Sequence, residues 1–163
     1  MSTCIIRQVC ENDIDTCFEV ESACFPIEEA ASMESIKIRA SCFPQGFYVA
    51  EMDGQVVGQV NSGATNKDDI TDEEFKQLIG HDPDGSNWVI FSLSVHPDFQ
   101  SAGIASLLMR EYIDSAKKYG CETILLLCKE ELVKFYERFG YENRGASSSS
   151  HGGSVWLEMA LNL

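Results

Sequence analysis

A short segment of small residues, 100–106, lies between a pattern that predicts a strand and one that predicts a helix. Gly103 has no side chain and Ala105 carries only a methyl group, so a ligand can approach the backbone closely. The first turn of a helix leaves backbone N–H groups unpaired, and the helix dipole places partial positive charge there. The segment therefore predicts a binding site for a phosphate-like anion.

The histidines and cysteines do not have the spacing of metal ligands. The chain contains no C-x-x-C pair and no H-x-x-x-H pair, so no metal site is predicted. The seven cysteines stand among apolar neighbours, and we expect reduced thiols in a cytoplasmic protein. His81 and His151 fall in expected loops and are predicted to be solvated.

The elements that position these residues follow from periodicity and turn signals. Strands are expected over 3–8, 47–52, 55–61, 87–95, 123–128, 141–143 and 155–161. Helices are expected over 13–24, 33–42, 104–119 and 131–139, and Ser32 is expected to cap the second of them. A further short helix is expected to begin at a capping box formed by Thr71 and Glu74 and to stop at Gly80. Val89, Phe91, Leu93 and Val95 are expected on one face of their strand.

The Asp53-Gly54 pair predicts a hairpin turn, and the loop of 146–153 is predicted to be polar and mobile. The acidic stretch 66–74 is interpreted as a solvated insertion between two strands. The strand, helix and strand over 87–128 predict a right-handed crossover with parallel pairing. The fold class is therefore α/β, with a mixed central sheet of six to seven strands flanked by helices.

Composition limits the function classes. The chain has 163 residues, which suits one domain over 1–163. Its formal net charge of −14 disfavours nucleic acid and anionic membrane as partners and favours small cationic molecules. No stretch is apolar enough to span a bilayer, and the N-terminal residues do not resemble a secretory signal.

The string LSVHPDFQSAGIASLLM, 93–109, resembles the acetyl-CoA signature of the GNAT superfamily of N-acetyltransferases, and the order of elements is similar over essentially the whole chain. The strings ESACFP (21–26), LLLCKEELVKFYERFGY (125–141) and GSVWLEM (153–159) are similar to the arylalkylamine N-acetyltransferases. The resemblance implies acetyl-CoA as cosubstrate and transfer of an acetyl group to an amine.

The resemblance also implies a cofactor site. The backbone of Leu93, Ser94 and Val95 is expected to bind the pantetheine arm. The pyrophosphate is expected at Gln100 and along the backbone of Ser101, Ala102, Gly103, Ile104, Ala105 and Ser106. Tyr136 matches the tyrosine beside the cofactor sulfur. A phenol has a pKa near that of a thiol, so Tyr136 is predicted to protonate the departing thiolate.

The acceptor side departs from the family pattern. By resemblance the acceptor is expected to contact Phe25, Pro26, Val89, Phe91 and Leu127. The vertebrate arylalkylamine enzymes carry an H-x-H pair where this chain has Val89 and Phe91, and neither can take a proton. His96 is interpreted as structural. The general base is left open between ordered water leading to backbone carbonyls and a carboxylate such as Glu28 or Glu29.

Three functions remain at this point. The first is acetyl transfer to the primary amine of a small molecule, with an arylalkylamine as one candidate. The second is acetylation of a protein lysine or N-terminus. The third is a non-catalytic regulatory module that binds acyl-CoA; the predicted acid at Tyr136 argues against it, because binding alone needs no acid. A monomer or a homodimer is expected.

Overall fold

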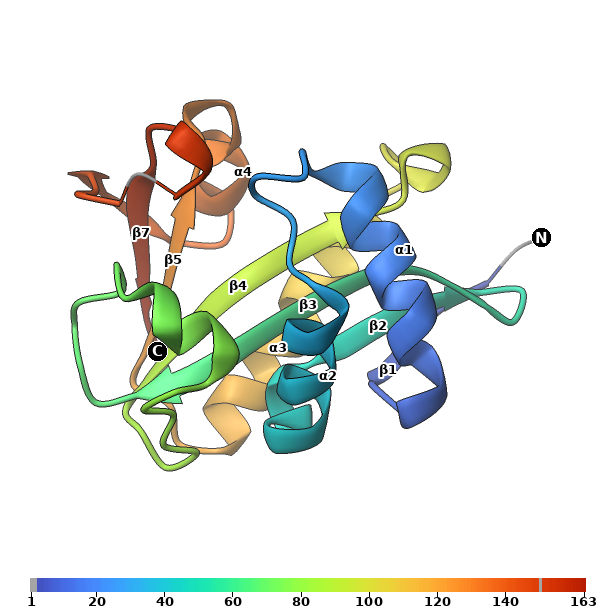
Figure 1. Ribbon diagram of the computed structural model, residues 1–163, viewed down its shortest axis with the longest axis horizontal. Coiled ribbons are helices and arrows are strands. Elements are labelled where there is room, and N and C mark those ends of the chain that lie inside the picture. Colours follow the sequence, from blue (N-terminus) through green and yellow to red (C-terminus); the bar gives the residue numbers. More distant parts are fainter. Residues whose placement is uncertain (1–2, 150) are drawn as a thin grey trace.

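The computed structural model describes residues 3–149 and 151–163 and contains a seven-stranded mixed sheet (Figure 1). In spatial order the strands are β1 (Cys4–Gln8), β2 (Tyr48–Met52), β3 (Gln55–Thr65), β4 (Asn87–Val95), β5 (Thr123–Cys128), β7 (Leu157–Asn162) and β6 (Glu142–Ala146). Among the described strands only β4 and β5 pair in parallel, and every other neighbouring pair is antiparallel. The predicted α/β class with a mixed sheet is confirmed.

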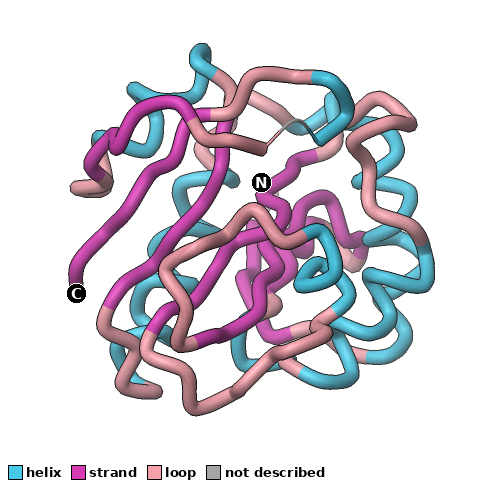
Figure 2. The backbone as a smooth tube through the Cα atoms, turned by 60° about the vertical axis from the view of Figure 1, so that its left-hand side comes forward, coloured by secondary structure: helices cyan, strands magenta, loops and turns pink. Residues whose placement is uncertain are grey.

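Helices cover both faces of the sheet (Figures 1 and 2). Helices α1 (Ile14–Cys24) and α2 (Met33–Cys42) cover the face that we call the front. Helices α3 (Ile104–Lys118) and α4 (Val133–Glu137) lie on the opposite face, the back. No helix in the described part of the chain is long and apolar enough to cross a membrane.

Local signals placed several of these elements correctly. Asp53 and Gly54 take positive φ values of 52° and 82°, which the tight turn between β2 and β3 requires. Ser32 caps α2, because its hydroxyl oxygen accepts a hydrogen bond from the Ser35 amide at 3.1 Å. Strand β3 runs to Thr65, four residues beyond the predicted end at Asn61.

Helix α3 packs along the back. Periodicity predicts a core stripe of Ala105, Leu108, Met109, Tyr112, Ile113 and Ala116, and of this set Ala105 and Ile113 are only half-buried. Ile104, Leu108, Met109, Tyr112 and Ala116 are buried, at the 3.6-residue spacing of one helix face. The predicted helix at 131–139 is a 3₁₀ turn, Glu130–Leu132, followed by the short α4.

The insertion between β3 and β4 differs from its prediction. The Thr71–Glu74 capping box is wrong: Asp72 caps the 3₁₀ segment Glu73–Gln77 and accepts from the Glu74 amide. The insertion is also only partly solvated, because Ile70 and Phe75 are buried in one cluster with Val89 of β4. Two apolar side chains among acidic ones are enough to fold the segment onto the front of the sheet.

A β-bulge in β4 overturns the prediction that four of its residues share a face. Asn61 of β3 pairs with Ser92, and the next residue of β3 pairs with Ile90, so Phe91 is the extra residue. Before the bulge Val89 and Phe91 pack at the front. After it the alternation is reversed. Leu93 and Val95 therefore pack into the core cluster of α3.

Strands β4 and β5 separate halfway along their length. Their pairing runs only from Asn87 opposite Thr123 to Ile90 opposite Leu126. Residues 91–95 of β4 have no partner on β5, and Figure 1 shows the two arrows diverging there. The backbone of Leu93, Ser94 and Val95, predicted to bind pantetheine, lies along this unpaired edge.

Candidate active site

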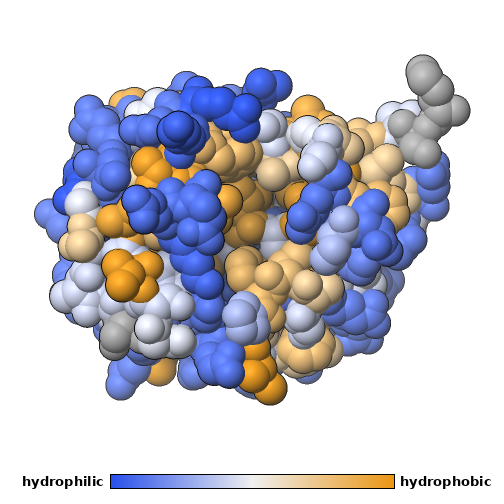
Figure 3. Space-filling view, turned by 90° about the horizontal axis from the view of Figure 1, so that it is seen from above, coloured by the Kyte–Doolittle hydropathy of each residue, from blue (hydrophilic) through white to orange (hydrophobic). Residues whose placement is uncertain are grey.

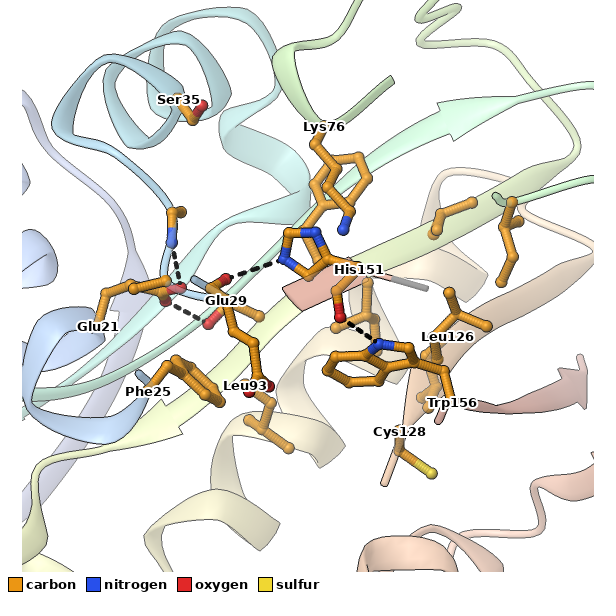
Figure 4. Close-up of a pocket in the computed structure, with 18 of the residues that line it drawn as sticks. Glu21, Phe25, Glu29, Ser35, Lys76, Leu93, Leu126, Cys128, His151 and Trp156 are labelled. Atoms are coloured by element: carbon orange, nitrogen blue, oxygen red, sulfur yellow. Dashed lines mark hydrogen bonds between the residues drawn. The ribbon is translucent and has the colours of Figure 1, made fainter. Parts of the chain in front are cut away.

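A cavity of about 600 Å³ opens where β4 and β5 separate (Figure 4). Seen from above, the molecule is hollowed here, and hydrophobic side chains follow the hollow between hydrophilic flanks (Figure 3). All five predicted acceptor residues line the cavity: Phe25, Pro26, Val89, Phe91 and Leu127. Leu93 and Tyr136 line it as well, so one space joins the predicted acceptor residues to the predicted acid.

The predicted pyrophosphate segment lies outside this cavity, at the start of α3. Gly103 is the N-cap with φ of 80° and gives the helix no side-chain cap. A Cβ built on Gly103 would meet nothing within 4 Å, so the positive φ, and not crowding, requires glycine. The Gln100 side chain donates to the Val95 carbonyl at 2.9 Å and ties the segment to the end of β4. The uncapped helix start suits an anion.

A buried carboxylate, Glu21 of α1, faces the cavity. It is 3% exposed, and its Oε1 accepts from the Ser92 hydroxyl at 2.6 Å. Its Oε2 accepts from the Ala31 amide at 2.9 Å, and the Gln59 side-chain amide lies 3.4 Å from Oε1. The donors are all neutral, so these hydrogen bonds orient the carboxylate without an ion pair.

A polar chain connects Glu21 to a buried arginine. Asn61 donates to Gln59 at 3.2 Å, and Arg39 of α2 donates to Asn61 at 3.0 Å. The guanidinium also lies over the Phe91 ring, 4.6 Å from its centroid. Burial lowers the pKa of Arg39 to about 10, although the negative charge of Glu21 acts in the opposite direction and raises it. Arg39 therefore remains charged at neutral pH and orders one wall of the cavity.

Tyr136 of α4 approaches the cavity from the back. Its ring packs edge-on against Phe135 and Tyr141, with centroids 5.2 and 5.6 Å away. Burial, with a smaller contribution from Cys128, raises the pKa of the phenol well above its ordinary value. The hydroxyl therefore keeps its proton throughout the neutral range.

Three loops meet across the front of the cavity. His151, in the connection between β6 and β7, has Nε2 3.2 Å from the Glu29 carbonyl oxygen and Nδ1 3.2 Å from a carboxylate oxygen of Glu73. Trp156 donates its indole N–H to the His151 carbonyl at 2.9 Å. We call this arrangement the three-loop contact, because Glu29, Glu73 and His151 come from three separate connections. Figure 4 shows the contacts of His151 with Glu29 and with Trp156.

The prediction that His151 and His81 are solvated is wrong. His151 lines the cavity, and its side chain is 24% exposed. His81 Nδ1 accepts from the Ala64 amide at 3.0 Å, and its ring packs edge-on against Phe43. His96 caps the turn after β4 through a 3.2 Å hydrogen bond from the Asp98 amide, in keeping with a structural role.

The two suggested carboxylate bases lie in different environments. Glu28 is exposed and does not line the cavity. Glu29 lines it, but its carboxylate pairs with Lys129 at 2.9 Å. Within residues 3–149 and 151–163, no group of three or more His, Cys, Asp or Glu side chains is arranged to hold a metal ion.

Sequence reasoning missed Glu21, Arg39, His151 and Trp156. A signal for Glu21 was present, because it stands four residues after Cys17 and seven after Ile14, on the apolar stripe of α1. An acidic residue on a buried stripe indicates a place in the fold where other groups must form hydrogen bonds or ion pairs with the carboxylate. The other three depend on contacts between segments far apart in the chain.

Residues 14–141 match the model of the acetyltransferase (GNAT) family. A Bacillus subtilis protein named probable hydrolase YhcX is 29% identical over 131 residues, which are 75% of this chain and 25% of that protein. Serotonin N-acetyltransferase of Mesocricetus auratus is 27% identical over 112 residues, 68% of this chain and 53% of that enzyme. The chain thus spans only a quarter to about half of these relatives.

Solved structures share the fold at low identity. The loading GNATL domain of CurA from Lyngbya majuscula superposes with a TM-score of 0.87 at 14% identity, over 98% of both chains. The GphF GNAT-like decarboxylase in complex with isobutyryl-CoA gives 0.85 at 18% identity, over 97% of this chain and 98% of that one.

Proposed function

The chain belongs to the GNAT family of acetyltransferases, and from that premise we propose that it transfers the acetyl group of acetyl-CoA to the primary amine of a small molecule. One observation carries the proposal: the Glu21 carboxylate and the Tyr136 phenol line one cavity from opposite faces of the sheet. A carboxylate can take a proton from an ammonium group, and a phenol can give one to a thiolate. The likeness to an enzyme named serotonin N-acetyltransferase supports an amine as acceptor.

We assign acetyl-CoA to the opening between β4 and β5. The unpaired edge of β4 at Leu93–Val95 offers backbone groups to an amide-containing arm, and the uncapped start of α3 offers N–H groups to the pyrophosphate. The GphF structure, which has this fold, holds isobutyryl-CoA. The thioester would then lie between Phe91 and Tyr136.

In the proposed reaction, Glu21 takes a proton from the acceptor ammonium, directly or through the Ser92 hydroxyl with which it shares a 2.6 Å hydrogen bond. The neutral amine attacks the thioester carbonyl carbon, the carbon–sulfur bond breaks, and Tyr136 protonates the thiolate. The nitrogen loses its second proton as the amide forms, and this proton restores the Tyr136 phenol, while Glu21 releases the first proton to solvent. Glu21 thus replaces Glu28 and Glu29 as the proposed base.

The three-loop contact favours a small acceptor over a polypeptide. It joins Glu29, Glu73 and His151 across the front, where an extended peptide would need an open groove. The aromatic lining of Phe25, Phe91 and Trp156 suits an apolar body attached to the amine.

Turnover with a panel of acceptors tests the proposal. The panel comprises tyramine, tryptamine, putrescine and two peptides, one with a free N-terminus and one with an internal lysine. We expect acetyl-CoA-dependent thiol release with a small amine and at least tenfold lower kcat/KM with either peptide. Preference for a peptide would establish the protein-acetylating alternative, and acetyl-CoA binding without any turnover would establish the binding module.

A further inference from the structure

Lys129 places a primary amine of the chain itself in the proposed acceptor cavity. The residue directly follows β5 and keeps an extended backbone. Leu125 and Leu127 of β5 pack at the front, and side chains two residues apart in an extended chain lie on the same side. Lys129 therefore continues this row, and it lines the same cavity as Leu93 and Tyr136.

The Lys129 ammonium already occupies a cation site. Both carboxylate oxygens of Glu29 lie 2.9 Å from Nζ, with the hydrogen bond to Oε2. The Glu29 side chain is only 6% exposed, and Nζ lies 5.8 Å from the centroid of the Trp156 ring. A desolvated carboxylate beside an aromatic face suits an ammonium group. The chain thus presents to its own cavity the chemical group that the proposed reaction acetylates.

We propose that Lys129 is an internal acceptor, so that the protein acetylates this lysine from acetyl-CoA when no external amine is present. The inference rests on the proposed function. Glu29 takes one proton from the Lys129 ammonium and passes it to solvent. The neutral Nζ attacks the thioester carbonyl carbon, the carbon–sulfur bond breaks, and the thiolate takes a proton from Tyr136. The nitrogen loses its second proton as the amide forms, and this proton restores the Tyr136 phenol. The products are acetyl-Lys129, free CoA thiol and one proton.

Geometry favours Lys129 over Lys76, the other lysine that lines the cavity. Lys76 lies in the 3₁₀ segment at the front and pairs with Glu73 at 3.2 Å. Figure 4 places it across His151 from Leu93 and Cys128, which mark the opening between β4 and β5. Lys129 follows Cys128 directly, and its flexible four-carbon stem lets Nζ turn toward that opening.

Acetylation would also remove an ion pair beside the three-loop contact. It removes the positive charge of Lys129, so Glu29 loses its ion-pair partner. The segment between α1 and α2 is then held to the rest of the front by one fewer contact, while the hydrogen bond of His151 to the Glu29 carbonyl remains.

Mass spectrometry tests the inference on the full chain incubated with acetyl-CoA and no amine. We expect one added acetyl group, mapped to Lys129, at a rate independent of protein concentration. Lys129→Arg keeps the positive charge but offers no lysine amine at this position, so the amount of acetylated protein should fall at least tenfold. Lys134→Arg is the matched control on the neighbouring surface groove and should keep it. Glu29→Gln should slow the modification at least tenfold.

The outcomes separate this inference from the proposed function. Amine turnover without acetyl-Lys129 overturns the inference alone, and loss of both reactions overturns the proposed function as well. Faster labelling of Lys76, equal labelling of surface lysines, or a rate that rises with protein concentration would each show that Lys129 is not an internal acceptor.

Discussion

Glu21→Gln is the substitution that most directly tests the proposed chemistry. Glutamine keeps the size and shape of the side chain and one acceptor oxygen. That oxygen can accept from the Ala31 amide, and the Ser92 hydroxyl can rotate to accept from the new NH₂ group. We expect a cost in folding stability of about 1 kcal/mol, because no buried donor loses every partner.

The kinetic effect should be much larger than the effect on stability. Loss of a general base slows the reaction by roughly 10²- to 10⁴-fold, which is roughly 3 to 5 kcal/mol on the barrier. Since the variant must draw on amine that is already neutral in solution, its rate should rise about tenfold per pH unit up to the pKa of the amine.

The assay is single-turnover thiol release at saturating acetyl-CoA between pH 6 and 10, with acetyl-CoA affinity measured by calorimetry. Glu28→Gln removes an exposed carboxylate from the same region without touching the cavity, and it should behave as the wild type. A wild-type rate in Glu21→Gln at pH 7 would show that Glu21 only orders the wall of the cavity.

Three further predictions concern the acid, the anion site and stability. Tyr136→Phe should slow the chemical step by roughly 10²- to 10⁴-fold with little change in the KM for acetyl-CoA, and an unchanged single-turnover rate would make Tyr136 a core residue only. Gly103→Glu should weaken acetyl-CoA binding at least tenfold, roughly 1.4 kcal/mol by calorimetry. Gly103→Ala shares the backbone strain at φ of 80° without the charge, and an equal loss there would disprove the anion site. Burial lowers the pKa of His81, so its contribution to stability is complete above its ordinary pKa of about 6.5 and is lost as pH falls through the lower folded-state value. Denaturant titrations from pH 8 to 5 should show that the stability of His81→Gln depends less on pH than that of the wild type. Identical pH profiles for the two proteins would show that His81 is not a source of this pH dependence.

The features that the sequence determined by itself depend on neighbours in the chain. The Asp53-Gly54 turn, the cap at Ser32 and the glycine before α3 each follow from backbone preferences within a few residues. The apolar stripe of α3 and the parallel pairing of β4 with β5 follow from periodicity and the handedness of crossovers. These rules predicted the fold. The five acceptor residues and Tyr136 were instead expected from the resemblance to the arylalkylamine N-acetyltransferases, and the structure brings all six to one cavity.

Tertiary structure alone decided which carboxylate is buried at the cavity. Glu21 and Ser92 are separated by 71 positions, and His151 and Glu29 by 122. Periodicity does not reveal the bulge at Phe91, which turns Ser92 toward Glu21 by inserting one residue in β4 against a register set by β3. The balance of burial and hydrogen bonding at Glu21 exists only when α1, β3 and β4 pack together, because each supplies a part of the environment that no single segment contains.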